Sequence, residues 1–265
     1  MKISVITVVY NNCSTLADTI ASVNAQDYTD LEHLVIDGGS TDGTVEVIEA
    51  HADKISYWVS EPDKGIYDAM NKGLRAANGE VIVMLNADDV YAHNQVLTKV
   101  MQVFEDETIE GVYGDLVYVK PDNLNQVVRC WYSGNYKLGY FLWGWMPPHP
   151  TFFVRKAVYD KYGFFDTQLR SAADYELMLR FIHKQGIKLA YLPEILVKMR
   201  TGGLSNASLK NRLQAAREDR KAWKINHLNP FFFTIWLKSF RKIPQFFLRY
   251  AIQTPTKADY QSKSF

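Results

Sequence analysis

The stretch that decides the fold is LVIDGGSTDGT, at residues 34–44. Its first three residues are apolar and typical of a buried strand, which ends at Asp37 and runs into a turn of Gly, Ser and Thr. Such a turn can present backbone N–H groups and begin a helix. An acid at the carboxyl end of a strand, beside a Gly-rich turn, suits a ligand that carries hydroxyls and phosphates. It equally suits an ordinary helix cap, so the segments on either side decide its role.

Strands and helices alternate around this stretch through the first half of the chain. Short apolar runs predict strands, and apolar residues three and four apart predict helices. The expected strands are 3–9, 34–37, 55–59 and 81–85, and the expected helices are 15–24, 44–50, 66–77 and 96–104. This alternation is typical of a mainly parallel sheet with helices on both faces.

The pattern changes near residue 111. GVYGDLVYV and VVRCWY predict two strands around a PDNLN turn. A loop at 143–150, a strand at 151–154 and a helix at 174–184 follow. We interpret this half as an antiparallel addition that carries the site for a second substrate.

The composition is that of an ordinary globular protein. Of 265 residues, 47% are apolar and 22% are charged, and the net charge of +1 gives no argument for a nucleic-acid partner. Cys13 and Cys130 form neither a disulfide framework nor a zinc motif, which favours a reducing, cytoplasmic compartment. The N-terminal MKISVITVVYNN lacks the features of a signal peptide, and no apolar run is long enough to predict a spanning helix.

A basic and aromatic segment lies near the end of the chain. Residues 221–250 hold six Lys or Arg and no Asp or Glu, so the other 235 residues carry about −5. Within 231–250 aromatic bulk is mixed with four cations, namely Lys238, Arg241, Lys242 and Arg249. Pro244 is expected to divide this segment into two helices. The mixture favours contact with an anionic membrane surface, and the alternative is a C-terminal helix packed on the rest of the protein.

Polar and acidic stretches follow the expected strands of the first half. They are YNN at 10–12, DGGS at 37–40, EPDKG at 61–65 and NADD at 86–89. In VIVMLNADDVY, five apolar residues run almost directly into Asp88 and Asp89, whose charges repel each other at the edge of a hydrophobic strand. Mg²⁺ or Mn²⁺ would relieve this repulsion, since both prefer oxygen ligands and often bridge carboxylates to phosphates. The alternative is that one of the two acids caps the next helix.

Five segments in order carry a resemblance to a known family. SVITVVYNN, VIDGGSTDGT, SEPDKGIYDAMNKG, ANGEVIVMLNADD and AADYELMLR resemble the family 2 glycosyltransferases over roughly residues 3 to 205. One departure is Asn86, which stands where the family often has the first acid of an Asp-x-Asp motif. The resemblance implies an α/β protein with a single, Rossmann-like glycosyltransferase A domain, a mixed, mainly parallel sheet and a C-terminal helical tail. Residues 1–115 would be its nucleotide-sugar-binding half, 116–210 its acceptor-binding half, and 211–265 the helical, basic and aromatic segment.

The same resemblance implies the reaction and its donor site. It predicts inverting, metal-dependent transfer of a single sugar from a nucleotide-diphosphate sugar, with UDP-hexose or UDP-N-acetylhexosamine as the expected donor. Asp37 then reads the uracil edge rather than capping a helix, and Asp89, together with Asp88, binds Mn²⁺ or Mg²⁺. The nucleotide-sugar-binding residues implied are Thr7, Val9, Tyr10, Asp37, Lys64, Asp68 and Asp88. For Lys64 the alternative is a solvated turn lysine paired with Asp63.

An inverting transfer also needs a general base for the attacking hydroxyl, and a carboxylate serves. Asp174 in LRSAADYELMLR follows small residues and begins an expected helix. The family carries an acid with that role at this position, commonly preceded by Glu where this chain has Ala173. A helix-capping role for Asp174 can coexist with this one, and Glu176 is the second candidate base.

The acceptor side rests on fewer residues. His149, Trp145 and Arg200 are candidates for contact with the acceptor or a phosphate, in segments that resemble those of the family. A structural histidine and core tryptophans are the alternatives for the first two. The expected acceptor is a glycan or lipid-linked oligosaccharide of a surface glycan, used by an enzyme at the inner face of the cell membrane. Two other function classes remain, a sugar-nucleotide nucleotidyltransferase and a noncatalytic nucleotide-sugar binding protein.

Overall fold

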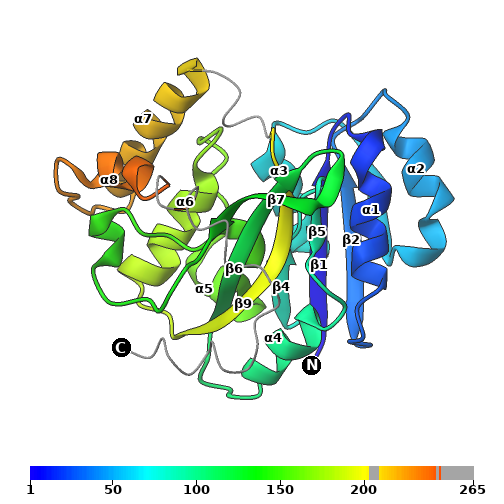
Figure 1. Cartoon of the computed structure of the whole chain (residues 1–265), viewed down its shortest axis with the longest axis horizontal. Coiled ribbons are helices and arrows are strands. Elements are labelled where there is room, and N and C mark those ends of the chain that lie inside the picture. Colours follow the sequence, from blue (N-terminus) through cyan, green and yellow to red (C-terminus); the bar gives the residue numbers. More distant parts are fainter. Residues whose placement is uncertain (203–208, 243–244, 246–265) are drawn as a thin grey trace.

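The computed structural model describes residues 1–202, 209–242 and 245. Within them a nine-stranded mixed sheet has the order β3-β2-β1-β4-β8-β6-β9-β5, and β7 pairs with β6 beside β8 (Figure 1). In the same part of the chain, no helix is both long enough and apolar enough to cross a membrane. The α/β class and the mixed sheet predicted from the sequence are confirmed.

The parallel half contains four strands and the helices that connect them. Strands β1 and β2 are parallel, as are β2 and β3, and β1 and β4. The strands are β1 (Ile3–Val9), β2 (Leu31–Asp37), β3 (Tyr57–Ser60) and β4 (Val81–Met84). The helices are α1 (Cys13–Asn24), α2 (Thr44–Ala50), a 3₁₀ turn (Ala52–Lys54) and α3 (Ile66–Ala76).

The second half adds antiparallel pairs to this sheet, and only β6 and β9 are parallel neighbours within it. Its strands are β5 (Asp89–Tyr91), β6 (Gly111–Lys120), β7 (Asn123–Trp131), β8 (Phe153–Arg155) and β9 (Leu189–Arg200). Its helices are α4 (Val96–Val103), α5 (Lys156–Tyr162) and α6 (Ala173–Met178), with 3₁₀ turns at Tyr140–Trp143 and His149–Thr151. Helix α6 continues as a π-helix over Leu179–Lys184. The two described C-terminal helices are α7 (Leu209–Ile225) and α8 (Thr234–Phe240).

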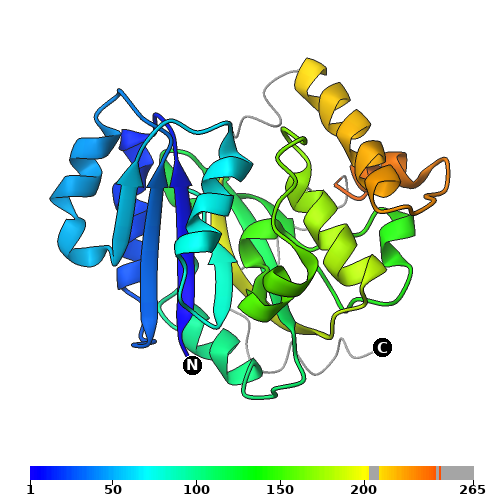
Figure 2. The same cartoon turned by 180° about the vertical axis from the view of Figure 1, so that it is seen from behind.

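Strand β1 is buried along its whole length because helices cover both faces of the sheet. Ile6 and Val8 point to the face covered by α3, whereas Ile3 and Val5 point to the face of α4. Figure 2 shows α3 in front of the sheet and Figure 1 shows α1 on the opposite side.

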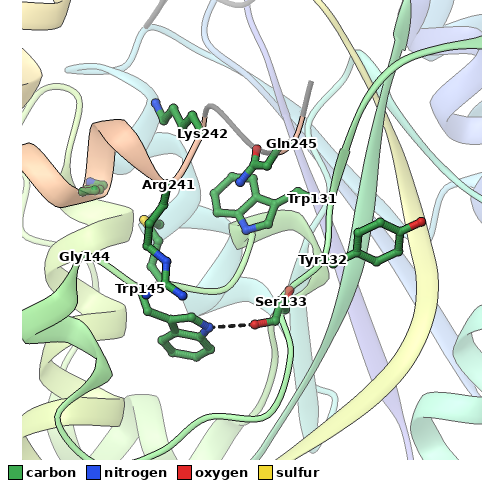
Figure 3. A pocket seen from close by; sticks show the side chains of 10 residues that line it. Trp131, Tyr132, Ser133, Gly144, Trp145, Arg241, Lys242 and Gln245 are labelled. Carbon is green, nitrogen blue, oxygen red and sulfur yellow. Dashed lines mark hydrogen bonds between the residues drawn. The ribbon is translucent and has the colours of Figure 1, made fainter. Parts of the chain in front are cut away.

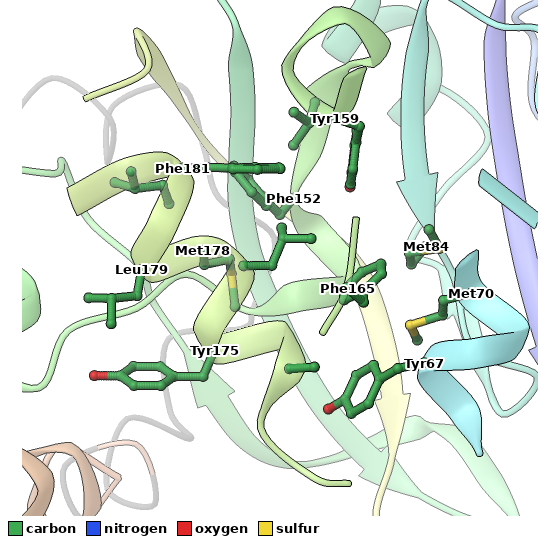
Figure 4. Packing of buried hydrophobic residues seen from close by; sticks show 14 of the residues in the cluster. Tyr67, Met70, Met84, Phe152, Tyr159, Phe165, Tyr175, Met178, Leu179 and Phe181 are labelled. Atoms are coloured by element: carbon green, nitrogen blue, oxygen red, sulfur yellow. The ribbon is translucent and has the colours of Figure 1, made fainter. Parts of the chain in front are cut away.

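The largest apolar cluster joins α3, α5, α6, α7 and α8 over one face of the sheet. In Figure 4, Tyr67 and Met70 of α3 face Phe165, while Tyr175 and Met178 come from α6. The cluster extends to Ile235 of α8, so the described part of the C-terminal segment packs on the domain. This packing holds the helix that carries Asp174 against α3.

Several elements differ from their predicted bounds. Strand β1 and helix α2 agree with the expected ranges, and the other expected helices of the first half agree to within two residues at each end. The long strand β9 was not predicted because Pro193 interrupts its pattern and few of its residues are fully buried. The loop expected at 143–150 contains parts of two 3₁₀ turns. The proposed boundary between the two halves at residue 115 falls inside β6.

Candidate active site

The loops that follow the parallel strands are hydrogen-bonded to one another at one edge of the sheet. Gly38 N–H donates to the carbonyl of Val9 at 2.9 Å, and Glu61 N–H donates to the carbonyl of Asp37 at 3.1 Å. Asn11 adopts a positive φ of 48°, and its side-chain carbonyl accepts from Thr41 N–H at 2.9 Å. The polar stretches at 10–12, 37–40 and 61–65 therefore form one surface, as the parallel strand order predicts.

The Asp37 carboxylate is fully buried and holds the Gly-rich loop together. Its Oδ2 accepts from Gly39 N–H at 3.1 Å, from Ser40 N–H at 2.9 Å and from the Ser60 hydroxyl at 2.6 Å. The Ser40 hydroxyl donates to Oδ1. Asp37 makes no capping hydrogen bond to α2, so the helix-cap alternative does not describe it. Its present contacts shape the loop, and its contact with a nucleotide base stays a prediction.

Two glycine positions allow the next loop to close on this one. A Cβ at Gly38 would lie 2.4 Å from Asp63 Oδ2 and 3.3 Å from the Tyr10 ring. At Gly39, where φ is +82°, a Cβ would meet Pro62 N at 3.3 Å. Glycine at both positions therefore brings the 61–65 loop directly onto the loop after β2.

The other predicted nucleotide residues are exposed to different degrees. Tyr10 is 64% exposed beside Gly38, and Lys64 is exposed in the loop after β3. Asp68 of α3 accepts from the backbone N–H of Lys64 at 3.0 Å and so fixes that loop. Thr7 is fully buried, with its hydroxyl 3.0 Å from His33 Nε2, and Val9 is buried beneath the edge.

Asp88 lies in the turn between β4 and β5, and Asp89 is the first residue of β5. Asp89 is fully buried, its Oδ2 accepts from Asn86 Nδ2 at 3.0 Å, and its Oδ1 has no partner among the described residues. Burial raises the pKa of both carboxyls, and the charge of Asp88 raises the pKa of Asp89 further. An unpaired, buried carboxylate oxygen beside a second acid is a fitting ligand set for Mg²⁺ or Mn²⁺. Since no three such groups converge in the described ranges, the protein would supply one or two ligands and leave others to the substrate.

Helix α1 and Arg200 hold this acidic loop in place. The Thr15 hydroxyl donates to the carbonyl of Ala87, and the Thr19 hydroxyl to that of Asp89, both at 2.8 Å. Arg200 is only 5% exposed; Nη1 donates to the carbonyl of Asp88 at 2.9 Å, and Nη2 pairs with Asp18. Arg200, predicted as a possible phosphate partner, here fixes the loop that carries the two acids.

Asp174 lies at the start of α6, where α3 reaches it. The Tyr67 hydroxyl of α3 donates to Asp174 Oδ1 at 3.1 Å. Burial and the nearby charge of Asp174 raise the pKa of Tyr67, so the phenol stays protonated and remains a donor. Tyr67 stacks on Phe165 with ring centroids 5.6 Å apart, and His149 meets the same ring edge-on at 5.7 Å. Burial lowers the pKa of His149 and outweighs the opposing charge of Asp174, which keeps the imidazole neutral at pH 7.

Glu176, the second candidate base, is buried on the other side of α6. Its carboxylate pairs with Arg180 Nε at 2.9 Å and accepts from Asn226 Nδ2 at 2.9 Å. This pairing removes Glu176 from the candidates for a general base. Asp174 is the acid of this helix that remains.

Comparison with known proteins identifies the family. The model of the family described as Glycosyl transferase family 2 matches residues 4–163. The chain belongs to glycosyl transferase family 2. An uncharacterized glycosyltransferase of Mycobacterium tuberculosis is 34% identical over 180 residues, which cover 67% of this chain and 68% of the relative. A PGL/p-HBAD biosynthesis glycosyltransferase of Mycobacterium bovis is 27% identical over 208 residues, covering 77% and 78% of the two chains.

Solved structures show the fold that family 2 membership implies. S. aureus TarS 1-349 in complex with UDP-GlcNAc has a TM-score of 0.68 at 18% identity, covering 85% of this chain and 65% of that one. Mannosyltransferase PcManGT from Pyrobaculum calidifontis, in complex with GDP-Man and Mn2+, has a TM-score of 0.65 at 19% identity, covering 90% and 69%. The sheet and helices of this family 2 glycosyltransferase thus form the glycosyltransferase A fold.

Trp145 belongs to the core, whereas Trp143, two residues earlier, lies at the surface. Trp145 is 4% exposed, and its indole N–H donates to the carbonyl of Ser133 at 2.8 Å. It packs among aromatic rings, of which Phe141 meets it edge-on at 5.6 Å. Trp143 is 53% exposed and lies beside Phe231. Trp145 is therefore a core residue, which was the alternative to contact with the acceptor. It also lines a pocket.

Sequence reasoning missed Tyr67 as part of the site. It lies next to Asp68, which was singled out, but its partner Asp174 is 107 residues away. Asn71, one turn further along α3, holds Phe165 through hydrogen bonds of 2.9 and 3.0 Å. Only the packing of α3 against α6 brings these residues of the family 2 enzyme together.

Proposed function

We propose that this glycosyltransferase moves one sugar from a nucleotide-diphosphate sugar to a hydroxyl of a glycan or lipid-linked acceptor, with inversion at the anomeric carbon. The observation that carries the proposal is the first turn of α3. There Asp68 fixes the loop of Lys64, while Tyr67 donates to Asp174. One helical turn thus connects the loops proposed for the nucleotide with the proposed base.

The chemistry assigned to the chain is a single displacement. The acceptor oxygen bonds to the anomeric carbon, the bond from that carbon to the diphosphate breaks, and its electron pair leaves with the diphosphate. Asp174 accepts the proton of the attacking hydroxyl. Tyr67 orients the carboxylate through Oδ1, and neutral His149 adds no positive charge beside it.

Asp89 and Asp88 are the proposed ligands of Mg²⁺ or Mn²⁺. A bound cation supplies Lewis-acid stabilisation of the charge on the leaving diphosphate. The unpaired Oδ1 of Asp89 supports this assignment, because a buried carboxylate oxygen without a partner is costly unless something binds it. Asn86 holds the carboxylate of Asp89 through a side-chain hydrogen bond. Thr19 and Arg200 hold the backbone carbonyls of Asp89 and Asp88, respectively.

The donor is proposed to be a UDP-sugar. The complex of S. aureus TarS with UDP-GlcNAc supports it, and the complex of PcManGT with GDP-Man makes guanosine the alternative base. Tyr10 offers an exposed ring at the edge of the sheet, and Asp37 lies in the wall behind it.

A donor screen with an Asp174→Asn variant tests this proposal. UDP-glucose, UDP-GlcNAc and GDP-mannose are each supplied with and without Mn²⁺, and release of the nucleoside diphosphate is measured. Loss of the base is expected to lower turnover at least about 100-fold while donor binding persists. The control is Asp160→Asn, an exposed carboxylate on α5. Full turnover in the Asp174 variant would refute the assigned mechanism.

We also propose that α8 and the turn before it touch a membrane surface. One side of α8 packs on the domain, since Thr234 is fully buried and donates to the carbonyl of Leu142 at 2.7 Å. Its other side and its flanks expose a group of aromatic rings: Trp143 at 53%, Phe232 at 87%, Trp236 at 63% and Phe240 at 58%. Exposed aromatics beside cations suit an anionic bilayer interface. The other predicted members of this segment, Pro244, Phe246, Phe247, Arg249 and Tyr250, lie outside the described residues.

Flotation with vesicles tests the membrane contact. The variant Phe232→Ala/Trp236→Ala/Phe240→Ala is compared with the full chain on vesicles with and without an anionic phospholipid. We expect the full chain to float with anionic vesicles and the triple variant to stay at the bottom. Tyr57→Ala, which removes an aromatic ring that is 46% exposed on β3, serves as the control. Equal flotation of all three proteins would contradict the proposal.

A further inference from the structure

A pocket of about 220 Å³ lies between the end of β7, the segment 144–146 and the end of α8 (Figure 3). Its lining includes the indoles of Trp131 and Trp145 and the cationic residues Lys238, Arg241 and Lys242. In Figure 3 Arg241 extends toward Trp145, whereas the Tyr132 ring turns away from both. The pocket therefore combines flat apolar walls with positive charge.

The wall of this pocket is fixed by packing. The Trp145 indole donates to the carbonyl of Ser133 at 2.8 Å (Figure 3). Gly144 has φ +74°, and a Cβ there would lie only 2.3 Å from the backbone N of Lys238. Only glycine lets α8 approach so closely, so the cations of α8 are held in a set position relative to Trp145.

Among the described residues that line the pocket, three are cationic and none is acidic. Lys238 pairs with Asp219 at 2.7 Å and lies 3.7 Å from the centre of the Tyr175 ring. Arg241 Nη1 donates to the carbonyl of Trp143 at 3.3 Å, which anchors the guanidinium at the rim. Burial and the charge of Asp174 raise the pKa of Asp219, while Lys238 and Lys242 oppose that rise. This cationic lining favours an anion.

A second feature points to a ligand. The side-chain oxygen of Gln245 is enclosed and has no hydrogen-bond partner among the described residues, and its amide lies over Trp131 in Figure 3. A ligand hydroxyl next to the anion would satisfy it. Tyr175, under Lys238, directly follows Asp174, so the pocket borders the helix of the proposed base.

We propose that this pocket binds a phosphate group carried by the acceptor, with Arg241 and Lys242 as its cationic contacts and the two indoles against the adjoining part of the acceptor. Guanidinium and ammonium groups together match the geometry and charge of a phosphate. This inference rests on the proposed transfer reaction, since it names a feature of its acceptor.

Calorimetric titration with hexyl phosphate in the presence of EDTA tests the pocket without a divalent cation. The wild type is expected to bind this probe saturably and more tightly than inorganic phosphate or hexanoate. Arg241→Gln and Lys242→Gln should each weaken binding about tenfold. Arg220→Gln removes an exposed cation of α7 outside the pocket and should leave binding unchanged.

Each other outcome overturns the inference. Inorganic phosphate binding as tightly as hexyl phosphate would indicate a free-phosphate site, and equal binding of hexanoate would indicate a general anion site. If Arg220→Gln weakened hexyl phosphate binding as much as Arg241→Gln does, the affinity would come from the overall positive charge and not from contacts in the pocket. Wild-type binding in both pocket variants, or no binding by the wild type, would exclude the site. The donor screen with Asp174→Asn reports on the transfer reaction separately, so the two proposals fail by different measurements.

Discussion

Asp89 is a fully buried acid whose Oδ1 has no partner among the described residues. The charge of its neighbour Asp88 raises its pKa, and Asn86 donates a side-chain hydrogen bond to its Oδ2. Such a carboxylate destabilises the metal-free fold, whereas a bound cation would reverse the effect.

We therefore expect Asp89→Asn to raise the melting temperature of the metal-free protein by a few degrees, equivalent to about 1 kcal/mol. The same substitution should abolish the further rise that Mn²⁺ produces in the wild type. Thermal unfolding with EDTA and with MnCl₂ measures both effects. Asp53→Asn, at an exposed acid of the 3₁₀ turn after α2, should behave as the wild type does. A Mn²⁺-induced rise that survives in Asp89→Asn would contradict the metal assignment.

The sequence alone predicted which acids are candidates for metal binding and for the general base, but it did not predict the residues that surround them. Local patterns place Asp88 and Asp89 after an apolar strand and Asp174 in the first turn of a helix. The contact between Tyr67 and Asp174 depends on tertiary packing over 107 residues. The orientation of the Arg200 side chain toward Asp88 depends on strand β9. This strand could not be predicted because Pro193 interrupts its sequence pattern.

The parallel strands β1, β2 and β4 are joined at their amino ends by a buried network around Glu32. Its Oε1 accepts from the Ser4 hydroxyl at 2.5 Å and from Asn78 N–H at 2.6 Å, and Oε2 pairs with Lys2 at 2.8 Å. Burial alone would raise the pKa of Glu32, but these hydrogen bonds outweigh it and lower the pKa to about 2. The network fixes the strands at the end opposite to the candidate site.

Glu32→Gln is expected to lower the free energy of unfolding at pH 7 by about 1–2 kcal/mol, a value reduced for the solvent exposure of Lys2. Because the folded-state pKa is below the ordinary glutamate value of 4.5, this stabilisation is present above pH 4.5 and is lost as the pH falls toward about 2. Urea unfolding at pH 7, 4 and 3 should show the difference between variant and wild type shrinking with acidity. A difference that stays constant over this range would contradict the assigned ionisation.

Elements with strong local patterns were predicted well. Strand β1 and helix α2 have the expected bounds because their apolar residues repeat with the period of their structure. Strand β5 is only three residues long and pairs with β9, so no local pattern identifies it. The packing of α8 on the domain could not be predicted from the charge or the aromatic content of the segment, because both also suit a membrane surface.

The whole molecule depends on a contact between the segment around Gly144 and helix α8. Gly144 meets the backbone of α8 where a Cβ would overlap Lys238 N and Leu237 C, at 2.3 and 2.7 Å. Gly186 has a similar φ of +65° but no atom within 4 Å of its would-be Cβ. An alanine at Gly186 would introduce only the strain of a left-handed backbone, whereas an alanine at Gly144 would add a steric overlap with α8. Comparing the two substitutions therefore isolates the effect of the close contact on stability.

Gly144→Ala should release α8 from the domain, whereas Gly186→Ala should only lower overall stability by about 1 kcal/mol. Limited trypsin digestion, followed by mass spectrometry, measures cleavage after Lys238 and Arg241. We expect cleavage there to accelerate at least about tenfold in Gly144→Ala, since local opening exposes the backbone. Equal cleavage rates in the two variants would show that the close approach at residue 144 does not hold α8.

The π-helical stretch Leu179–Lys184 has a consequence for how chain length can vary in this fold. Its wider turns close hydrogen bonds five residues apart, as between Gln185 N–H and the carbonyl of Arg180 at 2.9 Å. A wider turn accommodates one residue more than an α-helical turn, so a homologue that lacks one residue here would simply continue α6 as regular helix. One residue can therefore be removed downstream of Asp174 without rotating it away from Tyr67.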